Sequence, residues 1–84
     1  MRVPKDNRIT PARVELGKAL FFDPRLSDNN QMSCVTCHNP SFSWTDGLPI
    51  SIGRNNKKMT RSTPTILNAA YLRKLFWDGR ARSL

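Results

Sequence analysis

The only two cysteines and the only histidine of the chain fall within one short run, Cys34-Val35-Thr36-Cys37-His38. This is the C-x-x-C-H pattern of covalent haem attachment. On a helical turn, residues three apart lie on the same face, so both thiols can reach the two vinyl groups along one haem edge. His38 follows directly and can turn its imidazole towards the iron. The run therefore predicts one haem c, around which the rest of the chain must fold.

Three further interpretations of this run compete with haem attachment. Cys34 and Cys37 could form a disulfide or a redox dithiol, but the thioredoxin-type motif sits in a βαβ context that this chain lacks. A structural zinc site needs four ligands, and two cysteines with one histidine leave it short. A chance match is the third, because the motif has only three defined positions.

The length of the chain limits what it can bury. Its 84 residues allow one small domain, residues 1–84, which buries only about 60–65% of its unfolded surface. Hydrophobic residues make up 38% of the sequence and six residues are proline, and mean hydropathy is −0.53. A polar, loop-rich chain of this size depends on a bound group or a cross-link for stability.

The charge balance is strongly basic, with 14 lysines and arginines against 6 acids and a net charge of +8. Such a balance favours acidic partners and speeds encounter with them. The sequence has no helix-turn-helix, zinc-finger or RNP motif, so we expect a redox partner protein with an acidic surface rather than a nucleic acid. A solvated positive face would explain the same charge without a partner. Two clusters stand out: Arg54, Lys57, Lys58 and Arg61, and then Arg73, Lys74, Arg80 and Arg82.

No apolar stretch approaches the ~20 residues of a transmembrane helix, so we expect no membrane span. The first residues, Met1-Arg2-Val3-Pro4, lack the apolar segment of a signal peptide. Haem bound through cysteines is normally added after export. We therefore expect an exported protein whose leader is not part of this sequence.

Local signals predict short helices separated by a long ordered loop. Thr10-Pro11 and Thr63-Pro64 each combine a helix cap with a proline at the first helical position, while Asp23-Pro24 ends a helix. Ser33 can cap a short helix over the cysteines. The predicted helices cover residues 12–22, 34–38 and 65 to about 72, the loop covers 40–63, and residues 80–84 resemble the start of a further helix.

Apolar spacing assigns each longer helix a buried face. The first helix would bury Ala12, Leu16, Ala19 and Leu20, and the last would bury Ile66, Leu67, Ala70 and Tyr71.

The ligand on the second side of the iron is the open question. Met59 lies in the long loop and is a candidate sixth ligand, since a Met/His pair suits electron transfer. It can equally be an ordinary loop residue. A lysine, a water molecule or a ligand from a partner could then fill the sixth position, or the position could stay open. Trp44 and Trp77 are core residues or lie against the haem edge.

Beyond the attachment motif, the chain resembles the N-terminal haem domain of the bacterial di-haem cytochrome c peroxidase/MauG family. The similarity runs from about residue 10 to the C-terminus, in family order and spacing. Its segments are Leu16-Gly17-Lys18, Leu20 to Ser27, Ser33 to Asn39, Thr45-Asp46-Gly47, Ser51-Ile52-Gly53, Thr63 to Ala69 and Phe76 to Arg80.

The resemblance implies an all-α, cytochrome-c-like domain with long ordered loops around one haem c, in the periplasm. It implies that Cys34, Cys37 and His38 are the attachment cysteines and proximal ligand, and that Trp77 matches the tryptophan between the two haems. In the family this domain holds the peroxidatic haem, and a second haem domain supplies the electrons.

The chain departs from the family pattern at several points. Arg54 stands where many members have a distal histidine, and Ser62 replaces an asparagine that helps to bind calcium, which weakens a calcium assignment. The segment expected to carry the catalytic glutamate and the second haem domain are not in this sequence. The 84 residues resemble one half of the family's architecture or a fragment of it.

Two functions follow, and a third is weaker. The first is reduction of hydrogen peroxide with electrons from a cytochrome c, in which Arg54 or Arg61 would polarise the peroxide and no catalytic acid/base is identifiable. The second is a mono-haem electron carrier without peroxidase activity. The third is a module that works only as an oligomer or with a partner chain.

Overall fold

The computed structural model describes residues 1–82, and every regular element in this range is a helix. Extended pairing within residues 1–82 is limited to isolated bridges. The helical class predicted from the sequence is confirmed at this level. The α-helices are α1 (Pro11–Phe22) and α2 (Cys34–Cys37), and the 3₁₀ helices are η1 (Pro24–Leu26), η2 (Pro40–Phe42), η3 (Arg54–Asn56) and η4 (Ala69–Tyr71).

Helix α1 begins and ends where the sequence predicts. The Thr10 hydroxyl accepts a hydrogen bond from the Arg13 N–H at 3.3 Å, and Pro11 occupies the first turn. At the other end Asp23 caps η1 through the Arg25 N–H and pairs with the Arg25 guanidinium at 2.6 Å. The hydrogen bonds from Arg25 lower the pKa of Asp23 to about 2. The carboxylate therefore stays charged and keeps the turn after α1 in place.

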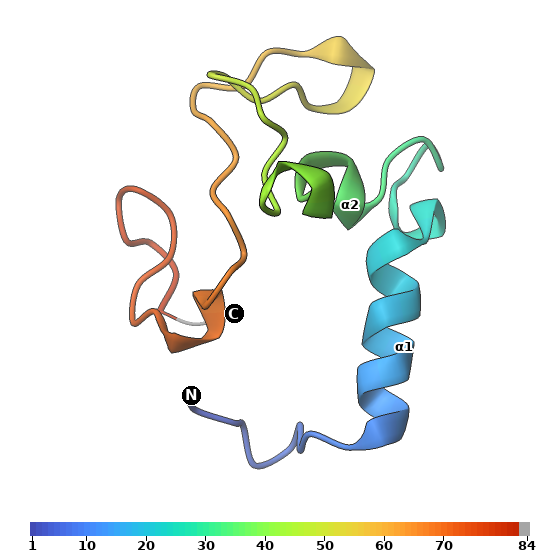
Figure 1. Cartoon of the computed structure of the whole chain (residues 1–84), viewed down its shortest axis with the longest axis vertical. Helices are drawn as coiled ribbons and strands as arrows, with labels where there is room; N and C mark the ends of the chain where they lie inside the picture. The colour runs from blue at the N-terminus through green and yellow to red at the C-terminus, as the bar shows by residue number, and fades with distance from the viewer. Residues whose placement is uncertain (83–84) are drawn as a thin grey trace.

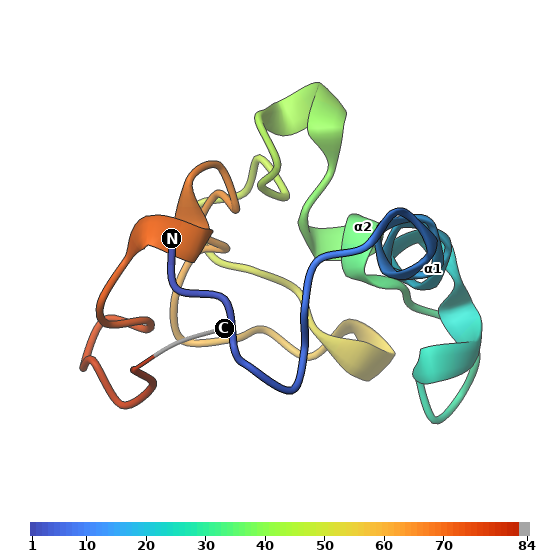
Figure 2. The same cartoon turned by 90° about the horizontal axis from the view of Figure 1, so that it is seen from below.

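The elements follow one another around an open path, which Figure 1 shows from the side and Figure 2 from below. Helix α1 forms one side, and α2 contacts it near the end at which the chain turns back. Residues 48–62 form a loop above α2, and residues 69–82 lie on the side opposite α1. In both views the N-terminal residues lie next to η4.

The predicted loop over residues 40–63 is confirmed as an ordered series of turns. Two isolated bridges close it into compact units, Asn39 with Thr45 and Ile52 with Lys58. Left-handed backbone at residues other than glycine makes the reversals within it. These positions are Ser43, Trp44, Asn55 and Asn56.

The predicted helix over residues 65–72 is wrong, since only η4 forms in this segment. The Thr63 hydroxyl donates to Asp46 rather than capping a helix, and the Thr65 hydroxyl donates to the Ser43 carbonyl. Asn68 then takes a left-handed conformation with φ 59°, which interrupts any helix. The predicted buried face is also wrong in part, because Leu67 and Tyr71 are exposed.

Residues 80–82 do not begin a helix. Ala81 pairs with Leu75 in an isolated bridge, and its backbone exchanges hydrogen bonds with Leu75 at 2.7 and 3.4 Å. The remainder of that predicted helix, residues 83 and 84, lies outside the described residues.

Burial within the described chain is slight. Ala69 and Ser51 are its only buried residues, while Leu16 and Leu20 on the predicted inner face of α1 are 58% and 37% exposed. Apolar burial by the chain's own side chains therefore stabilises this fold little, as the composition suggests. Hydrogen bonds between loops carry a correspondingly larger share of the tertiary structure.

The cap of α1 provides a first prediction. Thr10→Ala removes the acceptor for the Arg13 N–H and should lower the free energy of unfolding by about 1 kcal/mol. Denaturant unfolding of the protein, followed by far-UV circular dichroism, measures the change. Thr60→Ala is the matched control, because Thr60 is exposed and lies outside the regular helices. Equal stability of the two variants would contradict the assigned cap.

Candidate functional site

Helix α2 places the two cysteines one turn apart, as predicted. Ser33 occupies the N-cap position, and its N–H donates to the Thr36 hydroxyl at 3.0 Å. The His38 N–H donates to the Cys34 carbonyl at 2.9 Å and ends the helix. This single turn presents both sulfur atoms and the following imidazole as one group.

Both thiols are free, and they differ in surroundings. Cys34 is exposed and Cys37 is half-buried. Burial raises the pKa of the Cys37 thiol, and the nearby charges of Asp46 and Cys34 raise it further. Cys37 therefore stays a neutral thiol at physiological pH rather than a reactive thiolate.

The His38 ring is oriented by a backbone carbonyl. Its Nδ1 lies 3.1 Å from the Trp44 carbonyl oxygen. A neutral imidazole that donates from Nδ1 has its Nε2 lone pair directed away and available to a metal. Two thiols on one turn and an imidazole with a defined free nitrogen are the donor set that haem c requires, so these residues fit the group.

Trp44 links this site to α1. Its indole ring meets the Phe21 ring edge-on, with centroids 5.9 Å apart. Phe21 in turn contacts Phe22 at 5.4 Å. The sequence pointed to the Trp44 ring, whereas its carbonyl is the group that contacts His38. No sequence signal marks a carbonyl acceptor, because any residue carries one.

A second group of polar residues, which sequence reasoning missed, surrounds the turn that carries Trp44. The Thr63 hydroxyl donates to Asp46 Oδ2 at 3.0 Å and lies 2.6 Å from the Ser51 hydroxyl. Desolvation acts to raise the pKa of Asp46, but hydrogen bonds, first those from the Leu48 N–H and the Thr63 hydroxyl, outweigh it, so the net pKa is below its usual value. This carboxylate stays charged and joins three loop segments.

The remaining predicted site residues are engaged elsewhere. Arg54 forms an ion pair with Asp28, and the Arg61 guanidinium lies 5.7 Å from the centre of the Trp77 ring. Trp77 itself is 77% exposed. The structure thus brings Arg61 and Trp77 together, a pairing that the sequence did not indicate.

Met59 packs within its own loop. Its sulfur lies so close to Gly53 that a Cβ added there would be 2.9 Å away. The Met59 N–H also donates to the Ser51 carbonyl at 2.8 Å, and the side chain is half exposed. Nearby, a cavity of ≈ 360 Å³ opens between α2 and this loop, lined among others by Cys37, Asp46 and Gly53.

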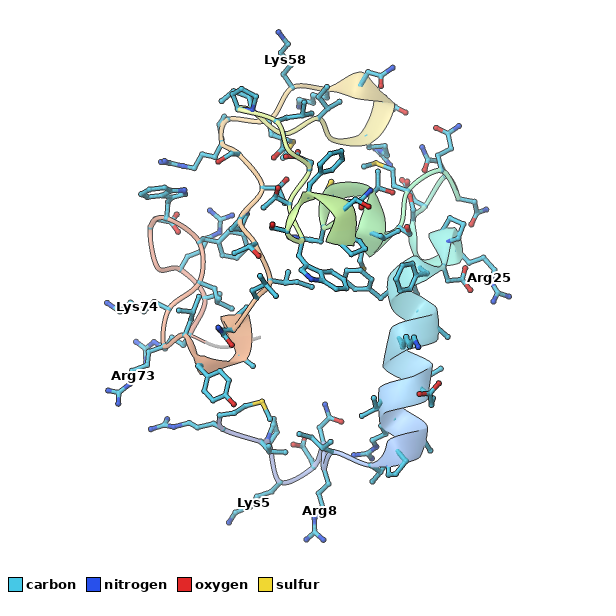
Figure 3. All side chains as sticks on the ribbon, in the orientation of Figure 1. Lys5, Arg8, Arg25, Lys58, Arg73 and Lys74 are labelled. Atoms are coloured by element: carbon cyan, nitrogen blue, oxygen red, sulfur yellow. The ribbon has the colours of Figure 1, made fainter. Side chains whose placement is uncertain are left out.

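The basic residues surround the molecule rather than forming one patch. Figure 3 shows labelled lysines and arginines from several segments, all pointing outward. Some charge is neutralised locally, since Arg80 pairs with Asp78 at 3.1 Å. The labelled residues are Lys5, Arg8, Arg25, Lys58, Arg73 and Lys74.

Metal-binding clusters and membrane-spanning helices are both absent from residues 1–82. Within that range, no group of three or more His, Cys, Asp or Glu side chains is arranged so that it could hold a metal ion. Ser62, at the position considered for calcium, is exposed. In the same range, none of the helices has the length and apolar character that crossing a bilayer requires.

Comparison with known proteins places the chain in a family. Residues 11–84 match the family model described as di-haem cytochrome c peroxidase. The chain belongs to this family. The resemblance noted from the sequence is thereby confirmed, and the family is one of haem-containing oxidoreductases that transfer electrons.

Individual relatives agree over most of the chain. The methylamine utilization protein MauG of Methylorubrum extorquens is 54% identical over 81 residues, which is 96% of this chain and 23% of that protein. The cytochrome-c peroxidase IdrP1 of Pseudomonas sp. (strain SCT) is 50% identical over 98% of this chain and 22% of its own length. The cytochrome c551 peroxidase of Pseudomonas aeruginosa is 47% identical over 90% of this chain and 22% of its length.

A solved structure shares the fold. A MauG-like protein associated with microbial copper homeostasis superposes with a TM-score of 0.86 at 39% identity. The match covers 90% of this chain and 24% of that protein's chain. The chain therefore corresponds to about a quarter of each relative.

The lowered pKa of Asp46 predicts acid sensitivity of the loops around Trp44. The contribution of Asp46 to stability is complete above the unfolded carboxyl pKa of about 3.9 and is lost as pH falls through the lower folded pKa. Stability measured by denaturant unfolding across this range should fall more steeply for the wild type than for Asp46→Asn. Asp6→Asn is the control, because Asp6 is exposed near the N-terminus and lies outside these loops. Identical pH profiles for wild type and Asp46→Asn would contradict the prediction.

Proposed function

We propose that residues 1–84 form one haem domain that carries a single haem c and works in periplasmic, peroxide-linked electron transfer. In this proposal Cys34 and Cys37 form the two thioether bonds and His38 ligates the iron. The observation that carries it is the hydrogen bond from His38 Nδ1 to the Trp44 carbonyl at 3.1 Å. It leaves Nε2 free on the same turn that presents both thiols.

The chemistry of attachment is consistent with the state of the two thiols. Cys34 and Cys37 would hold the haem as two thioethers, each formed by addition of the S–H across a vinyl double bond with no leaving group. The addition needs two free thiols, which Cys34 and Cys37 provide. Their separation by three residues on α2 matches the spacing of the vinyl groups along one haem edge.

When bound, the haem supplies one-electron redox chemistry at its iron and a position at which peroxide can bind. His38 would set the electron density on the metal through its hydrogen-bonded ring. Reduction of hydrogen peroxide to two waters consumes two electrons and two protons, which this chain alone does not supply. We propose a second haem domain or a partner cytochrome c with an acidic surface as the source of the electrons.

Trp77 is proposed as the residue through which electrons enter. Its ring is 77% exposed and lies under the Arg61 guanidinium. An exposed indole beside a cation suits contact with an acidic partner. Because Arg54 and Arg61 are engaged with Asp28 and Trp77, the proposal assigns neither a role in polarising peroxide.

Haem attachment is tested directly by mass. Protein recovered from its native cell envelope should carry the mass of one haem, and replacing both cysteines by serine should leave the bare polypeptide mass. Ser41→Ala, a change at an exposed serine, should keep the haem and serves as control. A wild-type protein with the bare polypeptide mass would overturn the proposed function.

A mono-haem electron carrier is the second candidate, favoured by the location of Met59 in a loop next to the cavity beside Cys37. The oxidised carrier would show the long-wavelength absorption band of a methionine–histidine haem, and Met59→Ala should abolish it. The peroxide-linked domain would instead be oxidised by peroxide, in stopped-flow mixing of the reduced protein, faster than free haem. A band that persists in Met59→Ala rules out Met59 as the ligand, and oxidation no faster than free haem rules out the peroxide reaction.

A further inference from the structure

We propose that Thr63 and Thr65 form a clamp that positions His38, because they hold the turn in which the Trp44 carbonyl accepts a hydrogen bond from the His38 Nδ1–H. The inference rests on the proposed function, in which His38 is the iron ligand. It assigns a role to two threonines that the sequence had marked as parts of a helix start. Their hydroxyls contact the turn over residues 43–46 from a segment about twenty positions further along the chain.

The turn is closed tightly by its own backbone. The Asn39 N–H donates to the Thr45 carbonyl at 2.9 Å, and the Trp44 N–H donates to the Asn39 carbonyl at 2.8 Å. These bonds bring residue 44 back beside residue 38. The Trp44 carbonyl is then directed at the His38 ring and not at a backbone N–H of the turn.

The conformation that aims this carbonyl is one that side chains disfavour. Ser43 and Trp44 have φ values of 54° and 63°, so two successive residues with a Cβ lie in the left-handed region. Such strain persists only where the surroundings hold it. The Thr65 hydroxyl supplies that restraint, because it donates to the Ser43 carbonyl at 2.7 Å. That carbonyl belongs to the peptide unit joining Ser43 to Trp44, and its rotation would turn Trp44 away from His38.

The second arm of the clamp acts on the far end of the turn. The Thr63 hydroxyl donates to Asp46 Oδ2 at 3.0 Å, so the Ser51 hydroxyl, 2.6 Å away, donates to Thr63. Pro64 separates the two threonines and restricts Thr63 to extended backbone. Residues two apart on an extended segment point the same way, which allows both hydroxyls to face the turn.

The hydrogen bond to the Trp44 carbonyl would affect both the orientation of His38 and the electron density that His38 donates to the iron. A histidine whose second nitrogen donates a hydrogen bond is a stronger, better oriented ligand. A stronger donor stabilises the ferric state more than the ferrous state. Release of the Trp44 carbonyl should therefore raise the reduction potential and expose the His38 Nδ1 proton to solvent.

The test compares Thr65→Val, which keeps the shape and removes the hydroxyl, with Thr65→Ser, which keeps the hydroxyl. In the haem-loaded protein, Thr65→Val should raise the reduction potential and speed exchange of the hyperfine-shifted His38 Nδ1 proton by about tenfold, the factor expected from loss of one restraining hydrogen bond. Thr65→Ser should restore both values. Thr60→Val and Thr10→Ala are the controls, and Thr10→Ala lowers stability without touching the clamp.

Each outcome decides the proposal. Haem-loaded Thr65→Val with unchanged potential and proton exchange overturns the clamp while the proposed function stands, whereas a wild type without bonded haem overturns the proposed function itself. If Thr65→Val does not fold and accumulate, the reduction potential and the Nδ1 proton exchange are measured on Thr63→Val and on the wild type instead. Slow exchange of the wild-type Nδ1 proton, together with a smaller rise of the reduction potential in Thr63→Val than that expected for Thr65→Val, supports the clamp. A wild-type Nδ1 proton that exchanges as fast as the proton of free imidazole refutes it.

Discussion

The hydrogen bond between His38 Nδ1 and the Trp44 carbonyl connects the end of the cysteine-bearing helix α2 to the turn that follows it. On one side it orients the ring at the end of the turn that carries both cysteines. On the other it depends on a strained reversal at Ser43 and Trp44, which later parts of the chain hold in place. The orientation of the His38 ring and the packing of the loops are therefore set by the same contacts.

This dependence on hydrogen bonds follows from how little the chain buries. Only Ala69 and Ser51 are buried among the described residues, and one of the two is polar. The Ser51 hydroxyl is hydrogen-bonded to the Thr63 hydroxyl, which in turn donates to Asp46. Where the chain's own residues bury little apolar surface, paired polar groups can still restrict the loops to one conformation.

Membership of the di-haem cytochrome c peroxidase family gives these contacts a context. The chain corresponds to about a quarter of relatives such as MauG of Methylorubrum extorquens. In the proposed function, the domain exchanges electrons with a partner. The net charge of +8 would speed encounter with an acidic protein surface, and the proposed function places the exposed Trp77, beside Arg61, at that contact.

Local sequence determined the parts of this protein whose signals are complete within a few residues. Thr10-Pro11 and Asp23 define both ends of α1, and C-x-x-C-H places both thiols and His38 on one turn. The same kind of signal failed at Thr63-Pro64, because the threonine hydroxyls find partners at Ser43 and Asp46 instead of capping a helix. Only the tertiary structure could decide this, since a hydroxyl's choice between its own helix and a loop about twenty residues away depends on which acceptors the fold brings near.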